Sequence, residues 1–173
     1  KSMKQSGYRE AFSEFKNMIS KEVWRHKELL VSDKLMPLNR KKLEMICDDT
    51  ADNAVYNTAL KLLSDCLYEV YGKKVIVLID EYDVPLENAY FNGFYDEMIN
   101  LIRSVFESVL KTNDSLEFAV LTGCLRISKE SIFTGLNNLN VYPVTDNAFS
   151  QYFGFTEQEV KQLADYYGLS DCF

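Results

Sequence analysis

A cluster of carboxylates follows an apolar segment in the middle of the chain. Residues 75–79, VIVLI, run directly into Asp80 and Glu81, and Asp83 comes two residues later. Carboxylate oxygens are ligands that Mg²⁺ favours, and a carboxylate can also orient or deprotonate a water molecule. Two adjacent acids at the end of a rigid element therefore suit a site in which the first holds a metal ion and the second activates a water. The alternative interpretation is that these acids begin a solvated loop.

The elements around this cluster predict where its side chains lie. The apolar runs and their periodicity predict a strand over 74–79, a helix over 95–111 and a second strand over 116–123. Strand, helix and strand in this order form a right-handed parallel crossover. The unbroken apolar run of the first strand is typical of a parallel sheet that is covered on both faces. Ligands of open α/β sheets bind beyond the carboxyl ends of the strands, where both Asp80 and Thr122 would lie.

The rest of the chain is predicted to be mainly helical, which makes the fold class α/β. Apolar residues at helical spacing indicate helices over 8–23, 38–47 and 51–71, and Gly72 stands where a helix commonly stops. Near the end of the chain, Thr156 and Glu159 have the spacing of a capping box, so a last helix is expected over 157–167.

A buried strand that ends in Asp-Glu is the Walker B pattern of P-loop nucleotide hydrolases. In that interpretation Asp80 holds Mg²⁺, and Glu81 is the catalytic base that polarises the water attacking the γ-phosphate of ATP. Thr122, at the end of the second strand, corresponds to the sensor position and would contact the nucleotide or the water. Arg126 could neutralise phosphate charge, or it could pair with a carboxylate such as Asp83. An ordinary strand-to-loop turn is the alternative for Thr122.

Four segments resemble a known family. They are SMKQSGYREAFSEFKNMISKE (2–22), KKVIVLIDEYDVPLENAYFNGFYDEM (73–98), AVLTGCLRISKESIFTGLNNLNVYPV (119–144) and FSQYFGFTEQEV (149–160). Their sequences and order are similar to those of the AAA-ATPase-like family, whose bacterial members usually carry a PD-(D/E)XK nuclease-like domain downstream. The resemblance implies an AAA-related P-loop NTPase fold in three layers, with a parallel sheet covered by helices. It also implies ATP and Mg²⁺ as cofactors, and contact with nucleic acid only through a downstream domain.

One part of a complete P-loop domain is missing from the sequence. The phosphate-binding loop, Walker A, needs the pattern G-x-x-x-x-G-K-[ST], and none of the seven glycines lies in such a pattern. We therefore expect residues 1–173 to be a single domain that is a fragment of the family's ATPase domain, with the Walker B and sensor strands but no Walker A. Such a fragment is not expected to hydrolyse ATP alone. Its exposed sheet edge could pair with a second chain.

Two further hypotheses explain the same residues. In the first, the chain is a non-catalytic regulatory or protein-interaction module that keeps these residues as scaffold. In the second, Asp80, Glu81 and Asp83 form a metal-dependent nuclease site. The second lacks the lysine two residues from an acid that such sites usually carry in a D…E-x-K arrangement.

Composition limits the other classes of function. The chain has 19 Lys and Arg against 26 Asp and Glu, which argues against a basic surface that wraps nucleic acid. No apolar segment approaches the ~20 residues of a membrane span, so a cytoplasmic protein that does not contact membranes is expected. The four cysteines form no C-x-x-C pair, and we expect reduced thiols, with Cys66 and Cys124 packed as small apolar side chains.

Overall fold

The computed structural model describes residues 6–124, 132–133, 136, 139–152 and 154–169. The chain divides into two compact units, Lys1–Asn137 and Asn138–Phe173, and each is described by itself. The elements of the first unit are α1 (Tyr8–Arg25), a 3₁₀-helix (Lys27–Val31), α2 (Pro37–Cys47), α3 (Asn53–Asn57), α4 (Ala59–Tyr71), β1 (Val75–Ile79), α5 (Val84–Asn92), α6 (Tyr95–Leu110) and β2 (Leu116–Leu121).

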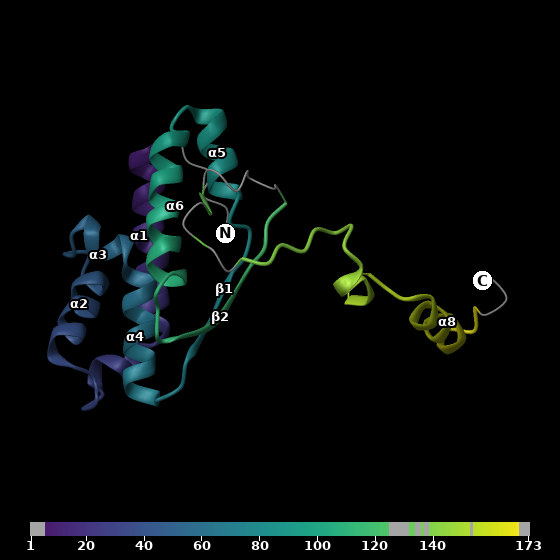
Figure 1. Cartoon of the computed structure of the whole chain (residues 1–173), viewed down its shortest axis with the longest axis horizontal. Coiled ribbons are helices and arrows are strands. Elements are labelled where there is room, and N and C mark those ends of the chain that lie inside the picture. The colour runs from purple at the N-terminus through teal and green to yellow at the C-terminus, as the bar shows by residue number, and fades with distance from the viewer. Residues whose placement is uncertain (1–5, 125–131, 134–135, 137–138, 153, 170–173) are drawn as a thin grey trace. The chain divides into compact units, whose positions relative to one another are not determined.

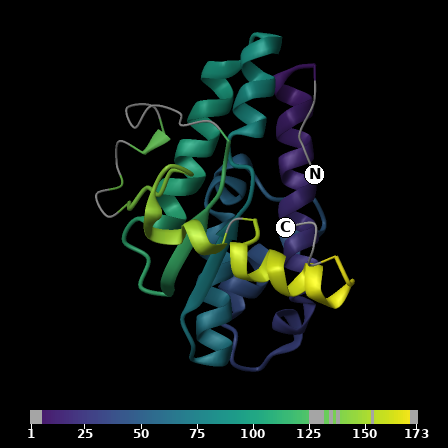
Figure 2. The same cartoon turned by 90° about the vertical axis from the view of Figure 1, so that its right-hand side faces the viewer.

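Helices build most of the first unit's core. In α6, one stripe at helical spacing is buried, and it includes Met98, Leu101, Ile102, Val105, Phe106 and Val109. Phe15, Ile19 and Val23 form a similar buried stripe on α1. α6 contacts both α4 and α5, and Figure 2 shows α5 beside α6. Burial of these stripes supplies the main driving force for folding of the unit.

Two helical predictions need correction. The helix expected over 51–71 is two helices, because the chain turns at Thr58 between α3 and α4. The hydroxyl of Thr58 donates to the carbonyl of Ala54 at 3.1 Å, a local bond of the kind that competes with a continuous helix. α5 was not expected at all, although Pro85 lies within its first two positions, where proline favours a helix start.

β1 and β2 pair in parallel, as the strand–helix–strand order predicts. The pairing aligns Ile79 with Leu121, so both strands finish at the same edge. α4 contacts β1 and α6 contacts β2, and Figure 1 shows helices α1, α4 and α6 on one side of the two strands. In the described part of the chain, this sheet has two strands.

In the described part of the first unit, helices cover one face of the sheet, whereas cover on both faces was predicted. The side chains of Ile76 and Leu78 on β1 and of Phe118 and Val120 on β2 are 51%, 74%, 50% and 45% exposed. We call these four residues the open face. The continuous apolar run remains typical of a doubly covered strand, but the described helices of the first unit supply one covering layer.

The second unit contains a 3₁₀-helix (Asn147–Tyr152) and α8 (Glu157–Tyr166). The predicted capping box is confirmed, because the Thr156 hydroxyl accepts from the amide of Glu159 at 3.3 Å. In return the Glu159 carboxylate accepts from the amide of Thr156 at 2.7 Å. No helix in the described ranges is both long enough and apolar enough to cross a bilayer.

Candidate functional site

The hydrogen-bond ladder of the sheet continues beyond the strand ends. The amide of Thr122 donates to the carbonyl of Ile79 at 2.9 Å, and the amide of Tyr82 donates to the carbonyl of Thr122 at 3.0 Å. These two bonds hold the loop after β1 against the turn after β2. The acidic residues that follow the first strand therefore lie beside the residues that follow the second.

Thr122 contacts both of the adjacent acidic residues. Its hydroxyl donates to the carboxylate of Asp80 and accepts from the backbone amide of Glu81 at 3.3 Å. All three residues are exposed at the carboxyl end of the sheet. The structure therefore brings together three of the four residues that the sequence marks as candidate site residues. The fourth, Arg126, lies outside the described residues.

Glu81 has an uncommon backbone conformation. Its φ is 54°, in the left-handed region that residues with a side chain rarely adopt. Such a conformation costs on the order of 1 kcal/mol and persists only where surrounding contacts enforce it. Here the Glu81 carbonyl accepts from the amide of Val84 at 3.2 Å, and its amide donates to the Thr122 hydroxyl. The turn at Glu81 is thus tied down on both sides.

Asp83 differs from the other two acids. It is only 3% exposed, and its carboxylate accepts the backbone N–H of Cys124 at 2.8 Å. Asp83 also occupies the N-cap position of α5, yet its side chain makes no capping bond there. An Asp at this position normally stabilises its own helix by about 1 kcal/mol. The sequence pattern Asp-Val-Pro is typical of a helix start and gives no sign of the contact with Cys124.

Aromatic packing also holds the loop after β1, through Tyr82. The ring of Tyr82 lies edge-on to Phe106 of α6, at 6.3 Å between centroids, and edge-on to Phe133 at 5.5 Å. Phe106 and Phe133 stack on each other at 6.2 Å. A side chain added at Gly123 would place its Cβ 2.7 Å from the Tyr82 ring. The lack of room for a side chain beside this ring therefore explains the glycine at position 123.

The chemistry available at this site is that of two exposed carboxylates and a hydroxyl. Among the described residues no group of three or more His, Cys, Asp or Glu side chains could hold a metal ion. Asp83 points its carboxylate at the Cys124 amide, so the three acids do not converge. A site of this kind can supply one carboxylate to a Mg²⁺ ion whose other ligands are phosphate oxygens and water.

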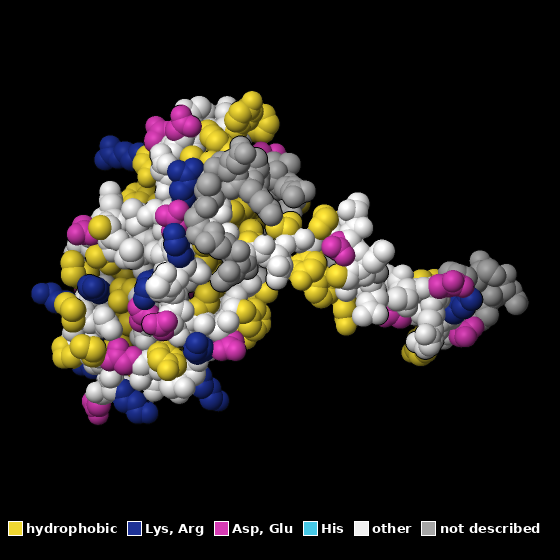
Figure 3. Space-filling view, in the orientation of Figure 1, with side chains coloured by type: hydrophobic (Ala, Val, Ile, Leu, Met, Phe, Trp, Pro, Cys, Tyr) yellow, Lys and Arg dark blue, Asp and Glu magenta, His cyan; other side chains and the backbone are white. Residues whose placement is uncertain are grey.

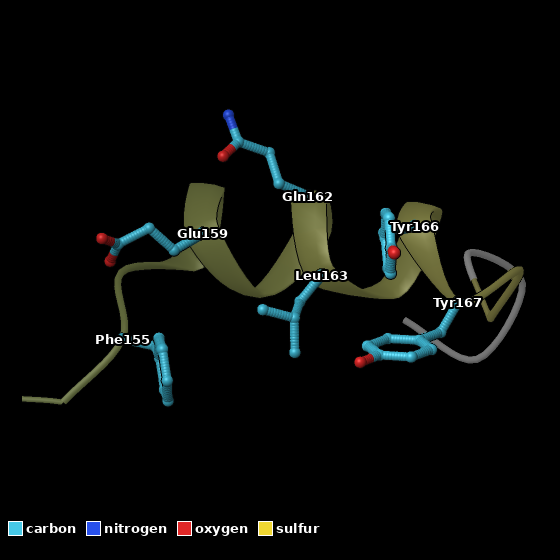
Figure 4. Close-up of a pocket in the computed structure, with 6 residues that line it drawn as sticks. All are labelled: Phe155, Glu159, Gln162, Leu163, Tyr166 and Tyr167. Atoms are coloured by element: carbon cyan, nitrogen blue, oxygen red, sulfur yellow. The ribbon is translucent and has the colours of Figure 1, made fainter.

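Two pockets on the described surface lie on α8 and α5. A pocket of about 440 Å³ lies along α8, where Phe155, Leu163 and Tyr167 point to one side (Figure 4). A second pocket, of about 230 Å³, lies against α5 and is lined by Val84, Glu87, Asn88 and Phe91. The charged side chains are not segregated on the face shown in Figure 3, where Lys and Arg are scattered among Asp and Glu.

Comparison with known proteins identifies relatives of the chain. A family model described as predicted AAA-ATPase matches residues 3–133. An uncharacterized protein in the vnfD 5′ region of Azotobacter chroococcum mcd 1 is 33% identical over 128 residues, which are 73% of this chain and 24% of that protein. The chain thus spans about a quarter of the length of this relative. No solved structure gives a significant match to the chain.

Proposed function

The chain belongs to the predicted AAA-ATPase family, and on this basis we propose that residues 75–81 are the Walker B segment of an ATP-hydrolysing P-loop domain. The observation that carries the proposal is the contact of the Thr122 hydroxyl with the Asp80 carboxylate and the Glu81 amide. It brings a metal-ligating acid, a second acid and a hydroxyl to one edge of a parallel sheet, where ligands of such sheets bind.

Each of these residues has a role in the proposed hydrolysis. Asp80 would hold Mg²⁺, which supplies charge neutralisation for the phosphates when it is bound. Glu81 would orient a water and accept its proton while the water oxygen bonds to the γ-phosphorus and the β–γ bridging bond breaks. Thr122 would keep the Asp80 carboxylate in place and contact the γ-phosphate. For Arg126 we propose neutralisation of phosphate charge.

The donor set fits this cofactor. Asp80 is exposed and lies at the end of a strand, and oxygen ligands are those that Mg²⁺ takes. Mg²⁺ in nucleotide sites is commonly held by one or two carboxylates together with phosphate oxygens, so a cluster of three acids is not required. The nuclease alternative has less support, because Asp83 is buried against Cys124 instead of facing the other acids.

We further propose that this chain supplies the Walker B and sensor part of the ATP site and that the phosphate-binding loop comes from elsewhere in a longer protein. The sequence contains no G-x-x-x-x-G-K-[ST], and the relative from A. chroococcum is about four times longer than the matched segment. The chain alone is then expected to bind ATP weakly or not at all by calorimetry. A low-micromolar dissociation constant for the chain alone would contradict this part of the proposal.

Self-association of the chain is a related proposal. The open face places four exposed apolar side chains side by side, and β2 has an outer edge to which no described strand is bonded. Exposed apolar patches and strand edges favour pairing with another chain. A location in the cytoplasm of a bacterium, where ATP and Mg²⁺ are abundant, completes the proposed setting.

The test of the catalytic proposal uses the longer protein that carries this chain. Glu81→Gln should lower steady-state ATP turnover at least 100-fold while ATP binding, measured by calorimetry, changes less than threefold. Glu87→Gln is the matched control, because Glu87 is a second exposed glutamate close by on α5 and should leave turnover unchanged.

The same measurements separate the second candidate function. A non-catalytic interaction module would show no ATP turnover in the unmodified protein. Its Glu81→Gln variant would also retain any partner binding. Turnover that is equal in the unmodified protein and in Glu81→Gln would remove Glu81 from the role of base.

A further inference from the structure

Besides the two bonds of the Thr122 hydroxyl, three hydrogen bonds cross-link the two strand ends, and the last of these three uses the side chain of Asp83. The first two are backbone bonds, from Thr122 to Ile79 and from Tyr82 to Thr122. The third runs from the backbone N–H of Cys124 to the carboxylate of Asp83 at 2.8 Å. We propose that Asp83 is a positioning residue, which clamps the loop carrying Glu81 to the turn carrying Thr122. This inference rests on the proposed ATPase function.

The Asp83 carboxylate bonds to the Cys124 amide and not to its own helix, which favours a role in the site over a role in stabilising α5. An aspartate at a helix N-cap normally accepts bonds from the first amides of its own helix. Here the carbonyl of Asp83 accepts from the amides of Leu86 and Glu87, at 3.0 and 2.9 Å, while its carboxylate turns away to the Cys124 amide. Places where a local rule is broken in favour of a distant contact tend to be functional sites.

Burial strengthens the clamp. Asp83 is 3% exposed, and a hydrogen bond shielded from water competes with fewer solvent molecules than one on the surface. The carboxylate lies against Gly123, because a Cβ at that position would come within 2.9 Å of its Oδ1 atom. The turn after β2 therefore approaches the Asp83 side chain more closely than a residue with a side chain would allow.

The clamp has a direct consequence for Glu81. Glu81 is bonded to Thr122 through its own amide, and its neighbours are anchored as well: Asp80 on one side, and Tyr82 and then Asp83 on the other. Between them its backbone has the left-handed φ of 54°. Without the outer anchor, we expect this strained turn to relax toward common conformations and to redirect the Glu81 side chain. Asp83 thus acts through Glu81 and does not itself contact the substrate.

Variants at position 83 in the longer protein separate positioning from charge. Asp83→Ala removes the acceptor, and we expect kcat for ATP to fall at least tenfold while KM changes less than threefold. Asp83→Asn keeps an oxygen that can accept the Cys124 N–H, and we expect its kcat to stay within threefold of the unmodified protein. Asp83→Asn as inactive as Asp83→Ala would overturn the clamp in favour of a role for the negative charge.

Gly123→Ala tests the same contact from the other strand, and it covers the case in which Asp83→Ala does not fold. Its Cβ would displace the Asp83 carboxylate or the Tyr82 ring, so kcat should fall as in Asp83→Ala. Unchanged kcat in folded Gly123→Ala, or in folded Asp83→Ala, would refute the proposal. Folding is checked by thermal unfolding of each variant.

Amide hydrogen exchange distinguishes failure of the clamp from failure of the proposed function. Peptides that contain the Cys124 amide should exchange faster in Asp83→Ala than in the unmodified protein, whereas Asp83→Asn should protect this amide. This readout does not depend on ATP hydrolysis. If the unmodified protein hydrolyses no ATP, the proposed function fails, and exchange that is equal in all three proteins contradicts the clamp itself.

Discussion

The hydroxyl of Thr122 donates a hydrogen bond to the carboxylate of Asp80, across the ends of two strands that are 42 residues apart in the sequence at this point. The same hydroxyl oxygen accepts from the amide of Glu81. One side chain therefore holds both acids in a fixed relation to β2. Because Thr122 is uncharged, a substitution at this position can change the geometry of the site without changing the charge of the site.

Thr122→Val should separate the hydroxyl from the shape of the side chain. The substitution keeps the branched side chain but removes the donor to Asp80 and the acceptor for Glu81, and a lost hydrogen bond to a charged group costs ~1.5–3 kcal/mol where it is shielded. Because this site is exposed, we expect less than ~1.5 kcal/mol of lost stability, with ATP turnover of the longer protein reduced at least tenfold. Thr122→Ser restores the hydroxyl and should recover turnover. If Thr122→Val and Thr122→Ser both keep the turnover of the unmodified protein, the hydroxyl is dispensable.

The open face predicts different outcomes for neighbouring residues of β1. Leu78→Glu should change the free energy of unfolding by less than ~0.5 kcal/mol, because Leu78 is largely exposed. It should also lower the tendency of the chain to self-associate in size-exclusion chromatography with light scattering. Val77→Glu, on the covered side of the same strand, should destabilise the chain by ~1–3 kcal/mol in urea unfolding. Similar destabilisation by both variants would mean that Leu78 is covered.

The cysteines should react with thiol reagents in a definite order. Cys66 is fully buried, and burial is the main cause that raises its pKa to about 12, so on the order of one in 10⁴ of these thiols is ionised at pH 8. Burial also raises the pKa of the half-buried Cys47. Cys124 is exposed. Among these three described cysteines, we expect Ellman's reagent to modify Cys124 first and Cys66 only on unfolding, and peptide mapping can assign each product. Early labelling of Cys66 would contradict the packing of α4.

Asp49 should contribute to stability in a pH-dependent manner. Its carboxylate pairs with Lys16 at 2.6 Å and accepts from the Tyr56 hydroxyl at 3.0 Å, and these bonds hold its pKa below the ordinary value of 3.8. A depressed folded-state pKa means that the contribution is complete above the unfolded-state pKa. It is then lost as the pH falls through the folded-state pKa.

The measurement is the free energy of unfolding between about pH 6 and pH 2. Asp49→Asn should lose less stability than the unmodified chain as the pH falls below about 4. Asp48→Asn leaves the pair of Lys16 and Asp49 in place, so it should retain the contribution of that pair. If Asp49→Asn and the unmodified chain have parallel profiles, the ion pair contributes nothing measurable.

Long periodic segments could be predicted from the sequence because their burial pattern is local. α6 was expected over 95–111 and lies at Tyr95–Leu110, and α8 was expected over 157–167 and lies at Glu157–Tyr166. The parallel pairing of β1 with β2 follows from the strand–helix–strand order. These features depend on patterns that the chain carries within a single element or a single crossover.

Features that depend on distant contacts could not be predicted in this way. Cys124 lies in an apolar segment and was expected to be packed, but the strand ends before it and leaves it exposed. The exposure of Leu78 depends on which layers cover the sheet, and this cannot be predicted from the apolar residues of β1 alone. The contact of Asp83 with Cys124 joins two loops 41 residues apart, and no local pattern at Asp83 indicates it.

The crossover between the strands also sets the order in which the molecule can assemble. Residues 80–115 separate β1 from β2, and α5 and α6 occupy most of them. Closing such a loop costs chain entropy before any hydrogen bond between β1 and β2 forms, whereas helices form from contacts within a few residues. We therefore expect the helices to form early and the strand ends with Asp80, Glu81 and Thr122 to meet late. A substitution deep in α6 would then slow the acquisition of the site, even though it touches none of those three residues.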